Sequence, residues 1–158
     1  MSIVRCSLVV FGARWARGPF MQRVGDFRVG TLNVLYPPPS NYGVEWLAKY
    51  HGTLGMTSDA VVTHGGSSDY WVKYEFNTID SPPSGVLKRI ATECPMLFFH
   101  LEFESDEIKG VIDAYDGHYD RVDIKEDDAE AQALAEIASL EANINVLPKN
   151  YKALGNGT

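Results

Sequence analysis

Two runs of strictly alternating residues constrain the fold of this chain more than any other feature of its sequence. From Trp71 to Glu104 the sequence reads WVKYEFNTIDSPPSGVLKRIATECPMLFFHLEFE. Residues two apart on a strand share one face, so each run predicts a half-buried strand with one apolar and one polar face. The predicted apolar faces are Tyr70, Val72, Tyr74 and Phe76 in the first run, and Leu97, Phe99, Leu101 and Phe103 in the second.

A helix is predicted between these two strands. Ser81 is a suitable N-cap, Pro82 is favourable at the first helical position, and Pro95 blocks continuation. The apolar stripe of this helix is Val86, Leu87, Ile90, Ala91 and Cys94. No side chain of Ser81–Gly85 is reactive by itself, so this segment is expected to join a strand to a helix rather than to bind a ligand.

Further alternating segments predict the rest of the sheet. They are Ile3–Phe11, with Val4, Cys6, Leu8 and Val10 on one face, then Asp26–Tyr36, Ala60–His64, residues 108–115 and His118–Ile124. The pattern slips beside Gly30, where a bulge is expected. Asp116-Gly117 indicates a two-residue hairpin between the last two strands.

Three more helices are predicted. The first opens at Gly18-Pro19 after an irregular segment and turns Phe20 and Val24 inward. The second begins at Ser40 or Asn41 and ends at Gly52. The third is an acidic, alanine-rich helix near the C-terminus, with Leu134, Ile137, Leu140 and Ile144 as its inward stripe.

Charge and composition narrow the classes of function. The 158 residues carry a net charge of −7, and the five arginines of residues 1–30 leave the rest of the chain more acidic still. An acidic body opposes direct nucleic-acid binding and favours a basic protein partner. No apolar run is long enough to cross a membrane, and two cysteines make neither a disulfide framework nor a metal set. A cytoplasmic location in a host cell is expected.

The segment YEFNTIDSPPSGVLKRIATECPMLFFHLEFESDEIKGVIDAYDGH resembles the ferredoxin-like domain of the YubB-type phage and plasmid proteins. The matching features are Phe76-Asn77-Thr78, Ser81-Pro82-Pro83, the helix over Val86 to Ala91, Pro95, the strand Leu97 to Phe103, and Gly110 followed by Asp116-Gly117. Upstream, Val29 to Pro39 is similar to the family's proline-ended strand. Trp46 to Asp59 is similar to its tryptophan-glycine-threonine segment, with Tyr50-His51 where the tryptophan is usual. The likeness covers roughly residues 3–120.

This resemblance implies an α+β fold: a ferredoxin-like antiparallel sheet with helices packed on one face, plus a C-terminal helix. The expected domains are residues 1–125 for the ferredoxin-like domain, 126–146 for the C-terminal helix, packed on the domain or extending from it, and 147–158 for a flexible tail. The resemblance also implies a mobile-element origin. It supplies no catalytic residues, and a shared fold does not decide function.

The sheet face opposite the helices is the predicted partner-binding surface, because aromatic side chains ringed by charges are typical of binding hot spots. Its predicted residues are Trp71, Lys73, Glu75, Phe98, His100, Glu102, Glu104, Asp106 and Glu107. Two other readings stay open for this face: the last helix covers it, or two subunits pack it together in a homodimer.

Three functions follow from these observations. The favoured one is a small accessory protein without enzymatic activity, cofactor or metal. It binds a host or defence-system protein, most sharply as an anti-CRISPR or anti-restriction inhibitor that occupies a basic nucleic-acid-binding surface. The second is a small metal-dependent hydrolase that uses His100 with Glu102, although no histidine pair has the HExxH spacing. The third is a homodimeric structural or assembly protein.

Overall fold

The computed structural model describes residues 2–65, 70–124, 134 and 136–138. Backbone contacts divide the chain into two units, Met1–Asp123 and Ile124–Thr158. The predicted C-terminal helix over 126–146 and the tail over 147–158 lie outside the described residues, except for Leu134 and residues 136–138, which are helical. The account below therefore concerns the first unit.

Six antiparallel strands form one sheet in the order β2-β3-β1-β4-β5-β6. Their bounds are β1 Ile3–Phe11, β2 Val61–His64, β3 Trp71–Ile79, β4 Phe98–Glu104, β5 Lys109–Tyr115 and β6 His118–Asp123. The first strand of the chain thus lies at the centre, between β3 and β4, where it pairs along its whole length with β3.

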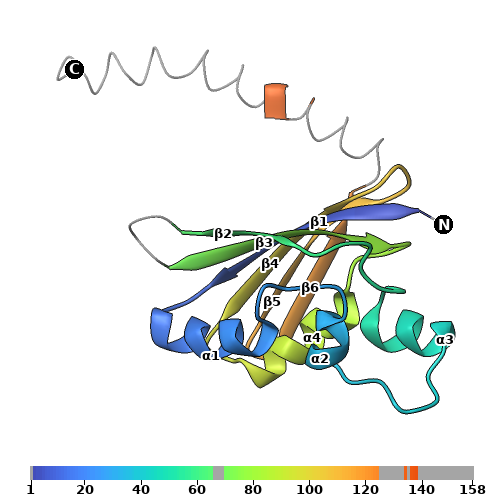
Figure 1. Ribbon diagram of the computed structural model, residues 1–158. Coiled ribbons are helices and arrows are strands. Elements are labelled where there is room, and N and C mark those ends of the chain that lie inside the picture. The colour runs from blue at the N-terminus through green and yellow to red at the C-terminus, as the bar shows by residue number, and fades with distance from the viewer. Residues whose placement is uncertain (1, 66–69, 125–133, 135, 139–158) are drawn as a thin grey trace. The chain divides into compact units, whose positions relative to one another are not determined.

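The helices lie on one face of this sheet (Figure 1). Their bounds are α1 Arg14–Val24, α2 Thr31–Leu35, α3 Val44–Trp46, a π-helical turn η1 Leu47–His51 that continues α3, and α4 Ser84–Glu93. The architecture belongs to the α+β class, as the sequence predicted. No helix in the described part of the chain is long and apolar enough to cross a bilayer.

The core lies between the sheet and the helices, and strand alternation builds its sheet side. Every second residue of β1, β3, β4 and β5 is buried, including the predicted apolar faces of Ile3–Phe11 and of Leu97–Phe103. The exception is Tyr70, which precedes β3 and is 63% exposed. From the helix side, Phe20 packs edge-to-face on Phe99 at 5.5 Å between ring centroids, and α4 contributes its predicted stripe up to Ala91.

The prediction of a strand over Asp26–Tyr36 was wrong. Gly30 lies in the left-handed region at φ 99° and starts helix α2 instead of forming a bulge. The helix buries Leu32 and Leu35, which are three residues apart. The slip in the alternating pattern beside Gly30 is therefore a helical spacing. Phe27 packs on the sheet next to Tyr74 and Phe76, with both centroid distances 4.9 Å.

Two helix starts also differ from prediction. Helix α1 begins at Arg14 rather than at Gly18-Pro19 and accommodates Pro19 inside it, although Phe20 and Val24 are buried as predicted. Its N-cap is Ala13, without a side-chain hydrogen bond, so the sequence carried no start signal. Helix α3 begins after Gly43 rather than at Ser40 or Asn41, and it ends in η1 before Gly52, the predicted stop.

The segment Ser81–Gly85 is a packed joint between β3 and α4. The predicted cap by Ser81 was wrong, because the N-cap of α4 is Pro83 and the Ser81 hydroxyl donates to the carbonyl oxygen of Gly52. The Thr53 hydroxyl donates to the Ile79 carbonyl oxygen at 2.8 Å. Residues 52 and 53 therefore tie the end of η1 to the end of β3 and to the start of α4.

Candidate functional site

The six strand residues predicted for a binding surface lie on the sheet face turned away from the helices. Trp71, Lys73 and Glu75 alternate with buried residues on β3, and Phe98, His100 and Glu102 do so on β4. The register places β1 between the two groups, with Phe11 opposite both Trp71 and Phe98. The groups are therefore about 10 Å apart, two strand spacings. We call the outward residues of all six strands the outer face.

A row of aromatic rings crosses the outer face at one end. In register it consists of Trp71 on β3, Phe11 on β1, Phe98 on β4, Tyr115 on β5 and His118 on β6, and we call it the aromatic row. Ring centroids are 6.2 Å apart for Phe11 and Phe98, 5.3 Å for Phe98 and Tyr115, and 5.2 Å for Tyr115 and His118. These contacts hold the rings in place while leaving them accessible.

Exposure of the aromatic row is large for side chains of this kind. Phe11 is 41% exposed, Phe98 36% and Tyr115 44%. Trp71 is half-buried, and its ring lies so close to Gly65 that a Cβ there would come within 2.9 Å of it. Alternation along the chain predicted Trp71 and Phe98 for this surface. Phe11, Tyr115 and His118 were not predicted, because only the strand order brings them into one row.

His100 lies beside the aromatic row, in the middle of the sheet. Its Nδ1 is 2.5 Å from Asp113 Oδ1 on β5, and its Nε2 is 3.5 Å from Glu102 Oε1. Partial burial lowers the pKa of His100, but hydrogen bonds to Asp113 and Glu102 raise it by more, so the pKa lies above its usual value near 6.5. Both ring nitrogens face acceptors, and the arrangement favours the imidazolium form.

The predicted pairing of His100 with Glu102 is present, and Asp113 joins it. Both imidazole nitrogens are directed at carboxylates, so neither faces a hydroxyl or thiol that it could activate. Among the residues that the structure describes, no group of three His, Cys, Asp or Glu side chains is placed to hold a metal ion. In the structure His100, Glu102 and Asp113 form a charged hydrogen-bonded cluster on the outer face.

The other predicted acidic residues lie at the opposite end of β4 from the aromatic row. Glu104 ends that strand 3.7 Å from Arg5, and Asp106 and Glu107 are exposed in the turn that follows. Seven residues of β4 separate the two ends by about 20 Å. Of the nine predicted residues, Trp71 and Phe98 therefore lie at one end of the sheet, Glu104, Asp106 and Glu107 at or beyond the other end of β4, and the remaining four between them.

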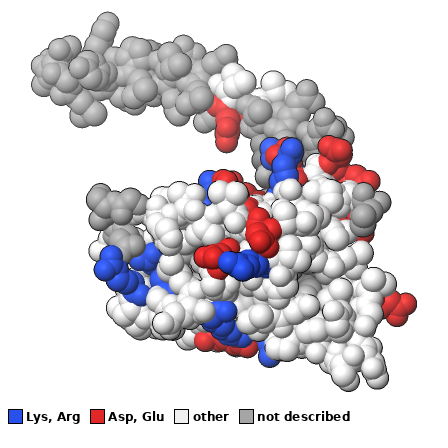
Figure 2. Space-filling model, viewed as in Figure 1, with Lys and Arg blue, Asp and Glu red and all other residues white. Residues whose placement is uncertain are grey.

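Charge on the outer face is mixed, with carboxylates in excess. Its strand residues include basic Arg5, Lys73 and Lys109 and acidic Glu75, Glu102, Glu104, Asp113 and Asp120. Lys73 is neutralised locally by Glu75 at 3.0 Å. On the side of the molecule seen in Figure 2, acidic and basic groups also lie next to each other, within larger uncharged areas.

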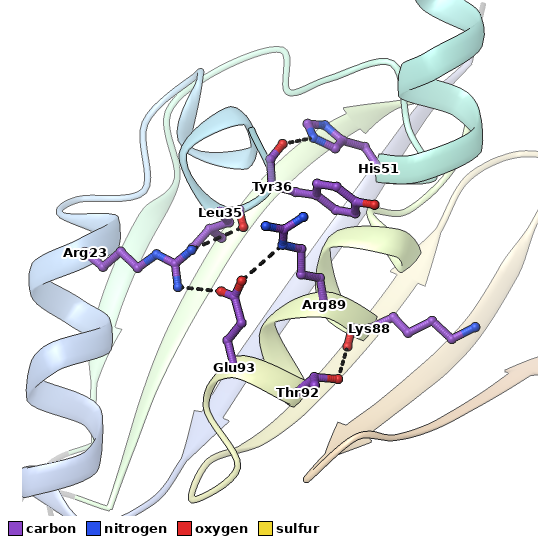
Figure 3. A network of polar contacts seen from close by, with 8 residues as sticks. All are labelled: Arg23, Leu35, Tyr36, His51, Lys88, Arg89, Thr92 and Glu93. Carbon is purple, nitrogen blue, oxygen red and sulfur yellow. Dashed lines mark hydrogen bonds and ion pairs between the residues drawn. The ribbon is translucent and has the colours of Figure 1, made fainter. Parts of the chain in front are cut away.

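A second polar cluster lies on the helix side of the sheet (Figure 3). Glu93 of α4 accepts hydrogen bonds from Arg23 at 2.7 Å and from Arg89 at 3.0 Å, and the Arg89 guanidinium lies 4.2 Å from the ring centroid of Tyr36. His51 donates from Nε2 to the Tyr36 carbonyl oxygen at 2.6 Å. Burial lowers the pKa of His51, so the neutral ring is favoured there.

Glu93 anchors this cluster electrostatically. Its partial burial raises the pKa of the carboxyl, but hydrogen bonds from Arg23 and Arg89 lower it by more, so the pKa lies below its usual range. None of these residues was singled out from the sequence, since α2 was not predicted and the cluster is assembled from four separate segments.

Comparison of the chain with protein families, curated proteins and solved structures found no match.

Proposed function

We propose that this protein acts by binding another protein through the outer face. The aromatic row carries the proposal, because five aromatic rings from five different strands are neighbours in register, and Phe11, Phe98 and Tyr115 at its centre are each at least 36% exposed. Rings already held by their neighbours lose little conformational freedom on binding, and aromatic side chains dominate protein interfaces. Charged residues beside them provide the polar rim that such interfaces have.

The partner is proposed to be basic. The outer face carries more carboxylates than basic side chains, and Asp106 and Glu107 add two exposed acids at its far end. A chain of net charge −7 is steered toward basic surfaces. In its sharpest form the proposal is a phage or plasmid counter-defence protein that occupies the nucleic-acid-binding surface of a host or defence-system protein in place of phosphates.

We also infer that β1, α1, β2, β3, α4 and β4 form a ferredoxin-like core that the hairpin β5–β6 extends. Support comes from the chain order strand–helix–strand–strand–helix–strand, with α2, α3 and η1 inserted before β2, and from the spatial order β4-β1-β3-β2. This core and the proline-rich joint are the features on which the proposed likeness to the YubB-type proteins rests. The mobile-element origin belongs to the same proposal.

The binding experiment compares variants of the full-length protein as bait in host-cell lysate at low and moderate salt. Phe98→Ala with Tyr115→Ala removes the centre of the aromatic row, and Tyr42→Ala removes an aromatic ring of similar exposure outside the outer face. A specific partner is expected to be retained by wild type and Tyr42→Ala and lost from the double variant. Equal retention by all three would refute binding through the aromatic row.

Charge reversal tests the basic partner separately. Glu102→Lys, Asp106→Lys and Glu107→Lys together are expected to abolish capture at low salt, while the wild-type interaction weakens as salt rises. Capture that survives the triple reversal would contradict the mimicry of nucleic acid. A homodimer through the outer face predicts instead a solution mass of two chains that falls to one in the Phe98→Ala, Tyr115→Ala variant.

A further inference from the structure

A hollow on the helix side of the sheet is lined by basic side chains, in a protein with an overall acidic charge. It has a volume of about 470 Å³ and lies between η1, α4 and the strand β6. We call it the basic pocket, because its charged lining residues are Lys49, Lys88 and Arg89, and none of the described residues that line it carries a carboxylate. The other residues used below are its three tyrosines, Tyr36, Tyr50 and Tyr119.

The cations of the basic pocket are only partly neutralised. Arg89 shares the single carboxylate of Glu93 with Arg23, so this cluster of three keeps an excess positive charge. Lys49 and Lys88 form no ion pair with any residue that the structure describes. In a chain with 21 acidic and 14 basic side chains, three cations around one hollow without a lining carboxylate are an unusual local excess.

The tyrosine rings hold these cations at the walls of the pocket. The Lys49 ammonium lies 5.1 Å from the ring centroid of Tyr50, and the Lys88 ammonium lies 5.2 Å from that of Tyr119. The Arg89 guanidinium stacks against the ring of Tyr36, as Figure 3 shows. Lys88 extends from α4 in a different direction. Such cation–π contacts position a cation without neutralising it, so its charge stays available to an anion.

We propose that the basic pocket binds a phosphorylated small molecule of mononucleotide size. Lys49, Lys88 and Arg89 hold the phosphate groups by charge-assisted hydrogen bonds, and the ring of Tyr50, which is 37% exposed, takes the flat base. The volume lies within the range of small-molecule sites, which is about 300–1,000 Å³. This site is separate from the outer face, because the sheet and its core lie between them, and it does not depend on the proposed protein binding.

Isothermal titration of the full-length protein with ADP tests this site. Saturable binding with a dissociation constant below about 1 mM at physiological salt is expected, and binding of adenosine or inorganic phosphate alone should be weaker. The variant Lys49→Gln with Lys88→Gln is expected to weaken ADP binding by at least about tenfold, since two charge-assisted hydrogen bonds to the phosphate groups are lost. Both lysines are exposed, so the substitutions leave the core intact.

The matched control is Lys73→Gln with Lys109→Gln, which removes the same charge from the outer face. Its ADP affinity is expected to stay within twofold of wild type. Equal weakening in both double variants would overturn the proposal, because it would indicate attraction by overall charge. Adenosine or phosphate binding as tightly as ADP would overturn it too, as would the absence of saturable binding with ADP, GDP, CDP and UDP alike.

Discussion

Two glycines in two helices are expected to respond in opposite ways to the same substitution. Gly85, in the first turn of α4, has no room for a methyl group, since a Cβ there would collide with the backbone oxygen and carbon of Tyr50. Backbone atoms cannot rotate away, so α4 and η1 would have to separate. Gly18, inside α1, is the opposite case, because a Cβ there meets nothing within 4 Å.

The size of each effect follows from these surroundings. Alanine is better than glycine inside a helix by about 0.5–1 kcal/mol, so Gly18→Ala is expected to raise the free energy of unfolding by that amount. At Gly85 the same gain is smaller in the first turn, and overpacking costs about 1–3 kcal/mol. Gly85→Ala is therefore expected to lower the free energy of unfolding by about 1–2 kcal/mol.

Urea unfolding followed by tryptophan fluorescence measures both variants against wild type. The midpoint is expected to rise for Gly18→Ala and to fall for Gly85→Ala, with the same slope in all three proteins. A Gly85→Ala protein as stable as wild type would show that α4 does not pack directly on the end of η1. The position of Tyr50 and Lys49 in the basic pocket would then lose its structural basis.

Three further predictions concern ionisable groups. The pKa of His100 measured by NMR should lie above 6.5, and Asp113→Asn should lower it. The stability that the His100–Asp113 pair adds is present below pH 6.5 and is lost as pH rises through the raised pKa of His100. Glu93→Gln should lower the free energy of unfolding by about 1 kcal/mol at neutral pH, and the difference from wild type should disappear as pH falls through the lowered pKa of Glu93. Burial raises the pKa of Cys6 to about 12 and also raises the pKa of half-buried Cys94. A disulfide reagent at pH 8 should therefore modify Cys94 slowly and Cys6 only after unfolding, and rapid modification of both thiols would contradict this packing.

The sequence predicted those parts of the fold in which one pattern repeats without interruption. Strand β1 has the predicted bounds, and β4 and β5 start within a residue of them, because four or more alternating residues leave no helical alternative. Helix α2 is only five residues long, and Phe27 and Gly30, which precede it, both have positive φ. The conformation of such a short segment is determined by tertiary packing, here by the burial of Leu32 and Leu35.

The candidate sites show the same limit more clearly. Alternation placed Trp71 and Phe98 on one face, but the aromatic row depends on strand order, and β1 pairs with strands 60 to 100 residues away in the sequence. The basic pocket was not predicted at all, since Lys49, Lys88 and Tyr119 come from three separate elements. Charge counted along the chain pointed to an acidic protein and could not reveal a local basic hollow.

The hairpin β5–β6 contributes to both proposed sites. Its outer side carries Tyr115 and His118 of the aromatic row, and its inner side carries Tyr119 beside Lys88. The backbone N–H of Gly117 in its turn donates to the Ala91 carbonyl oxygen of α4 at 3.3 Å, which fastens the hairpin to the helix that bears Lys88. A ligand that orders Tyr119 therefore also restrains the strand that carries His118. Protein capture measured with and without ADP tests this connection. ADP is expected to change the amount of partner captured by wild type but not by the Lys49→Gln, Lys88→Gln variant. Equal capture in all cases would show that the two faces act independently.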